Sequence, residues 1–139
     1  MTQEEDVAKN LTLIEYYKQQ LESIEMQLQY MQATVAEYQR AKITVEQLHA
    51  VDDNADILIP VGGGAFINGS VKNTSHVLLG VGAGFVMEKT VDETVAKLDE
   101  QIRKVQESYE KVVSLAQKIQ SDAEELSAKT QKMMEETKR

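Results

Sequence analysis

The 139-residue sequence contains no cysteine, no tryptophan and a single proline. Without cysteine the chain can form no disulfide framework, carry out no thiolate chemistry and offer no cysteine ligand to zinc, and its composition fits a reducing compartment. Aromatic residues make up only 5% of the chain, which argues against a compact enzyme core built on large rings. No apolar run reaches the roughly 18 residues that a membrane-spanning helix needs.

Positive charge is also scarce, because 15 Lys and Arg stand against 23 Asp and Glu and the net charge is -8. An acidic protein repels phosphate, so we expect no general binding to nucleic acid or to anionic membranes. Charged residues are 27% and hydrophobic ones 42%, which is too apolar for a disordered chain. The first six residues, Met1 to Asp6, are acidic and polar, unlike a signal or transit peptide, and we expect a cytoplasmic location.

Glycine and proline are confined to the middle of the chain. All seven glycines and the proline lie between Pro60 and Gly84, whereas the two flanks consist largely of good helix formers. This distribution predicts three parts of the chain. They are an N-terminal coiled-coil helix over 1–52, a β-hairpin assembly region over 53–89 and a C-terminal coiled-coil helix over 90–139.

Both flanks carry a seven-residue repeat typical of coiled coils, in which apolar residues recur at alternating steps of three and four. We call these positions the seam. In the first flank the seam is Val7, Asn10, Ile14, Tyr17, Leu21, Ile24, Leu28, Met31, Val35, Tyr38, Lys42 and Val45. In the second it is Val91, Val95, Leu98, Ile102, Val105, Tyr109, Val112, Ala116, Ile119, Ala123, Leu126, Thr130 and Met133. Thr2 and Glu5, like Thr90 and Glu93, have capping-box spacing at the two expected helix starts.

The two flanks have matching lengths, and the middle is long enough to reverse the chain, so we expect an antiparallel two-helix hairpin. Seam residues that face each other should then have numbers with a constant sum. A sum of about 140 lets large residues meet small ones, as with Tyr17 and Ala123. The polar seam members Asn10 and Thr130 fall in the same layer, and such layers commonly fix the register. Each arm would be about 45 residues, or roughly 65–70 Å, long.

Four short β-rich runs fill the middle of the chain, and glycine- or polar-rich turn sequences separate them. The runs are Ile57–Val61, Ala65–Val71, Val77–Val81 and Phe85–Met87. Two consecutive hairpins of about 33 residues fall below the roughly 40 usually needed to fold alone, and their open edges invite pairing. We therefore expect an α+β fold: a long antiparallel two-helix coiled coil with two inserted β-hairpins, which complete a larger oligomeric sheet or barrel with strands from other chains.

The residues of the two hairpins resemble those of prefoldin. The resemblance rests on residues 58–67 (LIPVGGGAFI) and 77–90 (VLLGVGAGFVMEKT), with a helix on either side. Two hairpins rather than one resemble the α-type subunit, and the short termini resemble archaeal members. This resemblance implies an ATP-independent holdase of two α-type and four β-type subunits, without enzymatic activity or cofactor. Its hairpins would form a double β-barrel body, and its distal coiled-coil tips would bind unfolded polypeptides and deliver them to a group II chaperonin.

Carried over to this chain, the resemblance implies two sets of functional residues. The assembly set is Ile57, Leu58, Ile59, Val61, Phe66, Ile67, Val71, Val77, Leu79, Val81, Phe85 and Met87. The client-binding set at the tips is Val7, Leu11, Leu13, Ile14, Tyr16, Tyr17, Ile119, Leu126, Met133 and Met134. Methionine is flexible and polarizable, so it suits contacts with many different segments. The alternative is that the tip residues only widen the coiled-coil core.

Other signals in the sequence favour structure over chemistry. The glycine clusters lack the Gly-Lys-Ser/Thr of a phosphate-binding loop, so turns explain them better. Asp52, Asn54 and Asp56 imitate the start of a calcium loop, but its twelfth place is Gly63 instead of glutamate. We predict no catalytic residue, metal site or cofactor site. The main rival function is a prefoldin-like scaffold or filament former that holds a fixed partner, and a nucleotide-binding enzyme is a distant third.

Overall fold

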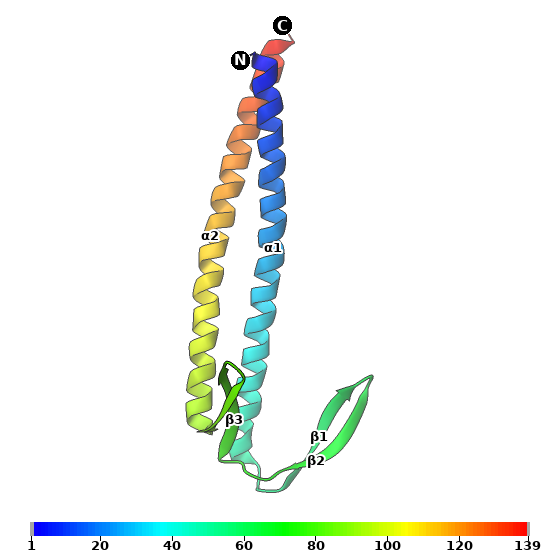
Figure 1. Cartoon of the computed structure of the whole chain (residues 1–139), viewed down its shortest axis with the longest axis vertical. Helices are drawn as coiled ribbons and strands as arrows, with labels where there is room; N and C mark the ends of the chain where they lie inside the picture. The colour runs from blue at the N-terminus through cyan, green and yellow to red at the C-terminus, as the bar shows by residue number, and fades with distance from the viewer. Residues whose placement is uncertain (1, 139) are drawn as a thin grey trace. The chain divides into compact units, whose positions relative to one another are not determined.

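The computed structural model describes residues 2–138 and shows two long helices with two β-hairpins between them in the sequence (Figure 1). A short 3-10 turn, Leu48–Ala50, follows the first helix. The remaining elements are α1 (Gln3–Gln47), β1 (Ala55–Gly62), β2 (Ala65–Val71), β3 (His76–Gly82), β4 (Phe85–Thr90) and α2 (Val91–Thr137). The predicted fold class is confirmed, and the two sheets do not close within the single chain.

The chain divides into two compact units, which we describe separately. The terminal unit contains the residues up to Thr34 and from Val105 onward, and the hairpin unit contains Val35–Lys104. Within residues 2–138, neither helix has a segment long and apolar enough to span a membrane.

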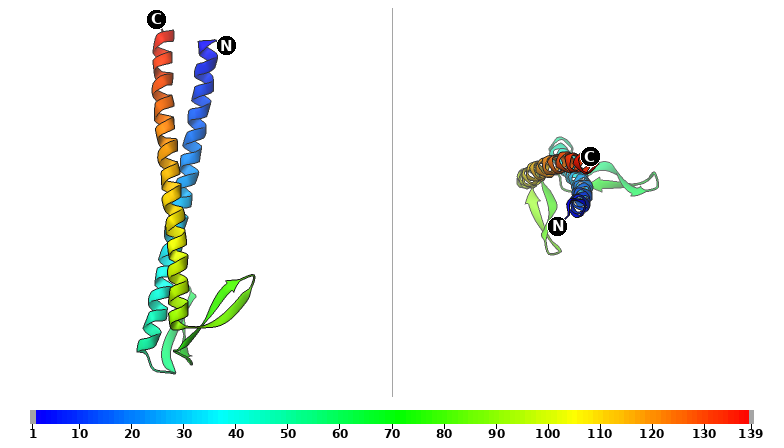
Figure 2. Two further views of the ribbon diagram at one scale, coloured as in Figure 1. Left: turned by 90° about the vertical axis from the view of Figure 1, so that its left-hand side faces the viewer. Right: turned by 90° about the horizontal axis from the view of Figure 1, so that it is seen from above.

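In the terminal unit, α1 and α2 run antiparallel, and both chain ends lie at the same end (Figure 2). Every seam residue of this unit is buried or half-buried, with Ile24 and Thr130 the most enclosed. The Gln32 side-chain amide donates a hydrogen bond to the Tyr109 hydroxyl at 2.9 Å, and these two residue numbers sum to 141. The helices therefore pair close to the predicted register.

The polar seam residues of this unit are satisfied separately. The Thr130 hydroxyl donates to the Leu126 carbonyl of its own helix at 2.7 Å. The Asn10 amide nitrogen instead donates to the Met133 sulfur at 3.8 Å. A hydrogen bond between Asn10 and Thr130 therefore does not contribute to the register. Among residues 2–138, no buried side-chain nitrogen or oxygen lacks a hydrogen-bond partner.

Each helix begins at a capping threonine. The Thr2 hydroxyl accepts the Glu5 N–H at 3.2 Å, and the Glu5 carboxylate accepts the Thr2 N–H at 3.4 Å, which confirms the predicted capping box. At the start of α2, the Thr90 hydroxyl accepts the Glu93 N–H at 3.1 Å. The chain therefore passes from β4 directly into α2, with Thr90 as the last strand residue and the helix cap.

In the hairpin unit, the adjoining parts of α1 and α2 bury Val45, Val91, Leu98 and Ile102. Lys42, the polar member of the predicted seam, lies between the helices and places its Nζ 2.8 Å from the Asp99 carboxylate. The hydrogen bond with Asp99 raises the pKa of Lys42. An ion pair at the edge of the seam therefore accommodates the one lysine that interrupts it.

The four strands form two separate antiparallel hairpins, β1–β2 and β3–β4. Gly62, Gly63 and Gly64 all have positive φ in the first turn, which only glycine adopts without strain. Each pairing also shifts by one residue just before its turn, at Gly62 and at Gly82. Three of the four strands are longer than predicted, since β1 and β3 begin earlier and β4 continues to α2, whereas β2 has the predicted bounds.

Candidate interaction surfaces

The β1–β2 hairpin has one entirely apolar face. Paired residues of an antiparallel ladder share a face, and neighbours along a strand alternate between faces. The register pairs Ile59 with Ile67, Ile57 with Gly69 and Ala55 with Val71. We call these six residues the isoleucine face. Ile57, Ile59 and Ile67 are 39–52% exposed, so much of this apolar surface remains uncovered in the single chain.

Gly69 allows the isoleucine side chains to lie across the ladder. A Cβ atom at Gly69 would come within 2.8 Å of the Ile59 Cδ1 and 3.7 Å of the Ile57 Cγ1. The two isoleucines therefore lean over the space that the missing side chain leaves. This close approach explains a glycine inside a strand, where glycine is otherwise unfavourable.

The opposite face of the β1–β2 hairpin is mixed. Its residues are Asp56, Leu58, Pro60, Phe66, Asn68 and Ser70. Leu58 and Phe66 are exposed there, beside polar neighbours. The predicted assembly residues of this hairpin thus divide between its two faces.

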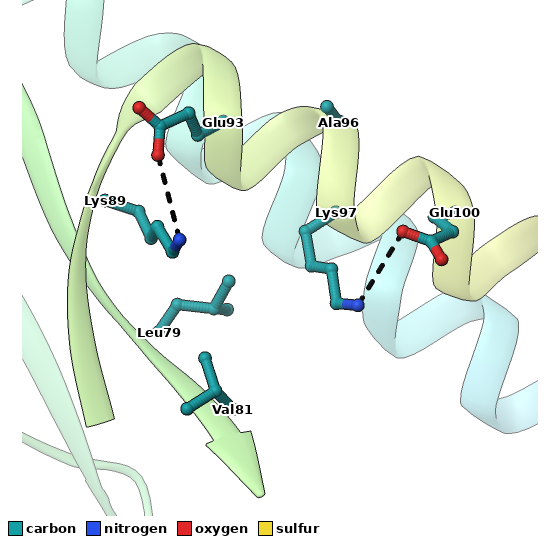
Figure 3. Close-up of a pocket in the computed structure, with 7 residues that line it drawn as sticks. All are labelled: Leu79, Val81, Lys89, Glu93, Ala96, Lys97 and Glu100. Atoms are coloured by element: carbon teal, nitrogen blue, oxygen red, sulfur yellow. Dashed lines mark ion pairs between the residues drawn. The ribbon is translucent and has the colours of Figure 1, made fainter. Parts of the chain in front are cut away.

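The β3–β4 hairpin directs its apolar face toward the start of α2. Leu79 pairs with Met87 and Val77 with Lys89, so these four residues share a face. A cavity of about 440 Å³ lies between this hairpin and α2 (Figure 3). It is lined by Leu79, Val81, Lys89, Glu93, Ala96, Lys97 and Glu100. Val77 and Leu79 are half-buried, unlike the isoleucines of the first hairpin, and Leu79 lines the cavity.

The charged groups around this cavity pair locally. Lys89 lies 3.9 Å from Glu93, and Lys97 lies 3.7 Å from Glu100, as Figure 3 shows. The hydrogen bond from Lys104, followed by the charge of Lys97, lowers the pKa of Glu100. Within the described residues, no group of three His, Asp or Glu side chains could hold a metal ion. Each carboxylate that lines the cavity is thus paired with a lysine of the same lining.

Sequence reasoning omitted two exposed residues of the β3–β4 hairpin. Leu78 and Val86 are 74% and 60% exposed, and both lie on the face opposite Leu79. The signal was available, because each lies one residue from a predicted member of the apolar face. Strand alternation places such residues on the other side of the hairpin.

In the terminal unit, the predicted tip residues fall into two groups. Four of them are exposed: Leu11, Leu13, Tyr16 and Met134, at 41–53%. The other six are half-buried in the seam: Val7, Ile14, Tyr17, Ile119, Leu126 and Met133. Val7 and Met134 share a groove of about 250 Å³, which Glu4, Thr137 and Lys138 also line. The structure therefore brings residues from both chain ends to one apolar groove.

Three further apolar side chains of the terminal unit are exposed away from the chain ends. They are Met26, Tyr30 and Leu115, with Met26 and Tyr30 more than 70% exposed. None of them belongs to the seam, so the search for a heptad repeat passed over them. Met26 and Tyr30 lie on α1 and Leu115 lies on α2, so both helices expose apolar side chains outside the seam.

A sequence model described as the prefoldin subunit matches residues 17–136. Among curated proteins, the prefoldin subunit alpha of Methanobrevibacter smithii is 37% identical over 90 residues, covering 63% of this chain and 61% of that protein. The prefoldin subunit alpha of Methanosarcina barkeri is 32% identical over 98 residues and 68% of each chain. The match thus spans less than two thirds of the length of the first of these relatives.

Two solved structures share the fold. Filamentous PFD from Methanocaldococcus jannaschii superposes with a TM-score of 0.74 and 21% identity, over 83% of this chain and 95% of that chain. The prefoldin beta subunit from Thermococcus strain KS-1 superposes with a TM-score of 0.59 and 22% identity, over 91% of this chain and 90% of that chain. At these identities the likeness is one of fold: two long helices with hairpins inserted between them.

Proposed function

The chain belongs to the prefoldin subunit family, and from that premise we propose that it acts as an α-type subunit of an ATP-independent chaperone that holds non-native polypeptides. The predicted resemblance to archaeal α-type prefoldin is confirmed by the relatives, which are α subunits of archaea. Prefoldin subunits are chaperone components and not enzymes, in agreement with the sequence analysis. The proposed activity is therefore reversible capture without chemistry.

The observation that carries the proposal is the exposed isoleucine face on a two-stranded sheet. A two-stranded hairpin is marginally stable at best, and its open edges present unpaired N–H and C=O groups. Strands from other subunits would satisfy these groups and bury Ile57, Ile59 and Ile67. We infer that the hairpins complete a β-barrel body with β-type subunits, in a complex of two α and four β chains. In this proposal residues 53–89 serve assembly, and residues 1–52 and 90–139 form the arm.

Client capture is proposed for the terminal unit. Leu11, Leu13, Tyr16 and Met134 offer exposed apolar surface, and the groove at Val7 adds a shallow cavity. Terminal helix turns fray, which would give clients access to the half-buried seam residues Val7 and Met133. Ile14, Tyr17, Ile119 and Leu126 lie deeper in the seam and would contact a client through the part of each side chain that remains exposed. Each arm would bind weakly, and several arms acting on one client would raise the affinity through effective concentration. Cytoplasmic location and transfer to a group II chaperonin belong to the same proposal.

Removal of the chain ends tests this assignment. A chain lacking residues 1–12 and 127–139 is mixed with a β-type subunit, its mass is measured by native mass spectrometry, and aggregation of unfolded citrate synthase is followed by light scattering. We expect an intact complex that no longer protects the client. The variant Leu11→Gln/Met134→Gln should lose part of the protection, and Ile43→Gln, an exposed residue of the hairpin unit, should lose none. Full protection by the trimmed complex would show that the tip assignment is wrong.

A second function is favoured by one comparison, because a structural relative of this chain is filamentous. A filament-forming scaffold would use the same hairpin edges in open, head-to-tail contacts. Mixing with a β-type subunit separates the two functions. A discrete heterohexamer supports the chaperone subunit, whereas long homopolymers of this chain alone, seen by negative-stain microscopy, support the scaffold.

A further inference from the structure

The two flanks of the α1 seam differ in charge within the terminal unit. Residues that directly follow a seam residue lie on one flank of the helix, and residues that directly precede one lie on the other. Between positions 11 and 34 the charged residues are Glu15, Lys18, Glu22 and Glu25, and each directly follows a seam residue. The preceding flank is entirely uncharged. It consists of Leu13, Tyr16, Gln20, Ser23, Gln27, Tyr30 and Thr34, which we call the uncharged flank.

Three exposed apolar side chains of α1 lie on the uncharged flank, Met26 lies next to it on the outer face of the helix, and Leu11 lies on the opposite flank. Leu13, Tyr16 and Tyr30 are 41%, 53% and 74% exposed, and Met26, one turn before Tyr30, is 73% exposed. In a chain with 27% charged residues, the outer surface of a coiled coil is expected to be charged. A strip without charge that exposes tyrosine and methionine instead marks an interaction site.

We propose that the uncharged flank, together with Met26, binds an extended segment of non-native polypeptide, so that client contact continues along α1 from Leu13 to Tyr30. This inference rests on the proposed holdase function. It adds a surface that extends along the interior of α1, away from the helix turns at the chain ends. Leu13 and Tyr16 belong both to the predicted tip residues and to the uncharged flank, so the strip begins at the proposed tip and continues along the helix.

The chemistry of the strip fits an unfolded chain better than a folded partner. Leucine, tyrosine and methionine bury apolar side chains of variable shape, and methionine adapts to many of them. Glutamine, serine and threonine donate and accept hydrogen bonds, which suits the exposed peptide groups of an extended chain. Without charge, the strip does not select clients by their charge. A fixed folded partner is usually held by complementary charges and a defined shape, and this flank has no charge to complement.

The length of the strip sets the size of the bound segment. From Leu13 to Tyr30 the helix rises roughly 26 Å at 1.5 Å per residue. An extended polypeptide covers this distance with about eight residues at 3.3 Å each. A single arm would therefore engage a segment of about eight residues that combines apolar side chains with free peptide groups.

The test compares two variants of the full-length chain in its complex with a β-type subunit. Met26→Gln/Tyr30→Gln removes the apolar groups and keeps a good helix former at both positions. Ile43→Gln is the matched control, since Ile43 is a 55% exposed apolar residue of α1 that directly follows a seam residue. Binding of fluorescein-labelled, reduced and carboxymethylated α-lactalbumin, a permanently unfolded protein, is measured by anisotropy. Circular dichroism and native mass spectrometry check the fold and the assembly.

We expect the double variant to raise the Kd for the unfolded protein about tenfold, which corresponds to a loss of about 1.4 kcal/mol of binding free energy. The control should bind as the wild type does. A benzophenone side chain at position 30 should crosslink to the client, and one at position 43 should not. A Kd within twofold of the wild type would overturn the inference. A changed oligomeric mass would also overturn it, because the strip would then take part in contacts between subunits.

The inference and the proposed function fail in different ways. If the wild-type complex does not bind the unfolded protein, the holdase function fails and the inference fails with it. If the wild type binds and Leu11→Gln/Met134→Gln weakens binding, but Met26→Gln/Tyr30→Gln does not, the holdase function stands and the uncharged flank is not a client surface.

Discussion

Replacing Ile67 with lysine is expected to abolish assembly while the single chain stays folded. Ile67 lies on the isoleucine face opposite Ile59 and is 52% exposed, so about half of its side chain remains to be buried. Full burial of isoleucine contributes about 1.5–3 kcal/mol, and the remaining half contributes about 1 kcal/mol per subunit. An unpaired ammonium group inside an apolar barrel adds a penalty of several kcal/mol. Together these terms weaken assembly by roughly a thousandfold or more.

The neighbouring residue of the same strand provides the matched control. Asn68 is exposed on the mixed face, so Asn68→Lys adds the same charge next to the same position without placing it on the isoleucine face. Native mass spectrometry with a β-type subunit measures assembly, and circular dichroism of the single chain measures folding. Normal assembly of the Ile67→Lys chain would refute the reasoning. Equal disruption by both variants would show that the two faces are not distinguished in the complex.

Two further variants test the helices. Thr130→Val removes a hydroxyl that is hydrogen-bonded within its own helix, which costs about 1 kcal/mol of stability. It also buries a methyl group, which contributes about 0.8 kcal/mol, so the midpoint of thermal unfolding should shift little. A loss of more than about 2 kcal/mol in the free energy of unfolding would contradict this reasoning. Asp99→Asn removes the partner that raises the pKa of Lys42. A raised lysine pKa stabilises the fold below the ordinary lysine value and loses that effect as pH rises through the raised value. The variant should therefore melt slightly below the wild type at neutral pH, and the two should converge in strongly alkaline buffer.

The helical part of the fold was predictable because one physical requirement determines it. Burial of a stripe on each helix demands apolar residues at alternating steps of three and four, and every seam position proved buried or half-buried. The ion-pair partner of Lys42, in contrast, was not predictable from the repeat. The repeat placed Lys42 in the seam, but its partner could not be chosen from the sequence, because acids on both helices lie within reach of a long side chain. Only the three-dimensional structure selects Asp99.

The exposed apolar residues of the hairpins were predictable from the sequence, but their distribution between the two faces of each hairpin was not. Strand alternation separates neighbours, yet the register decides which residues of two strands meet, and the shifts at Gly62 and Gly82 set that register. Met26 and Tyr30 were overlooked for a different reason. A search for burial finds residues that the fold needs, whereas these two are exposed and contribute little to the fold. Such residues become visible only when exposure is known.

As proposed surfaces for assembly and for clients, the isoleucine face and the uncharged flank would make different kinds of contact. Isoleucine is β-branched and stiff, and it loses only about 0.5–1 kcal/mol of side-chain entropy on burial, so its gain on burial is large and specific in shape. Methionine and glutamine lose about 1.5–2 kcal/mol each, which leaves a smaller net gain for every contact on the flank. Contact through the hairpins should therefore be long-lived, and contact through a single arm should be brief. A holdase needs both, because its body must persist while each client is released.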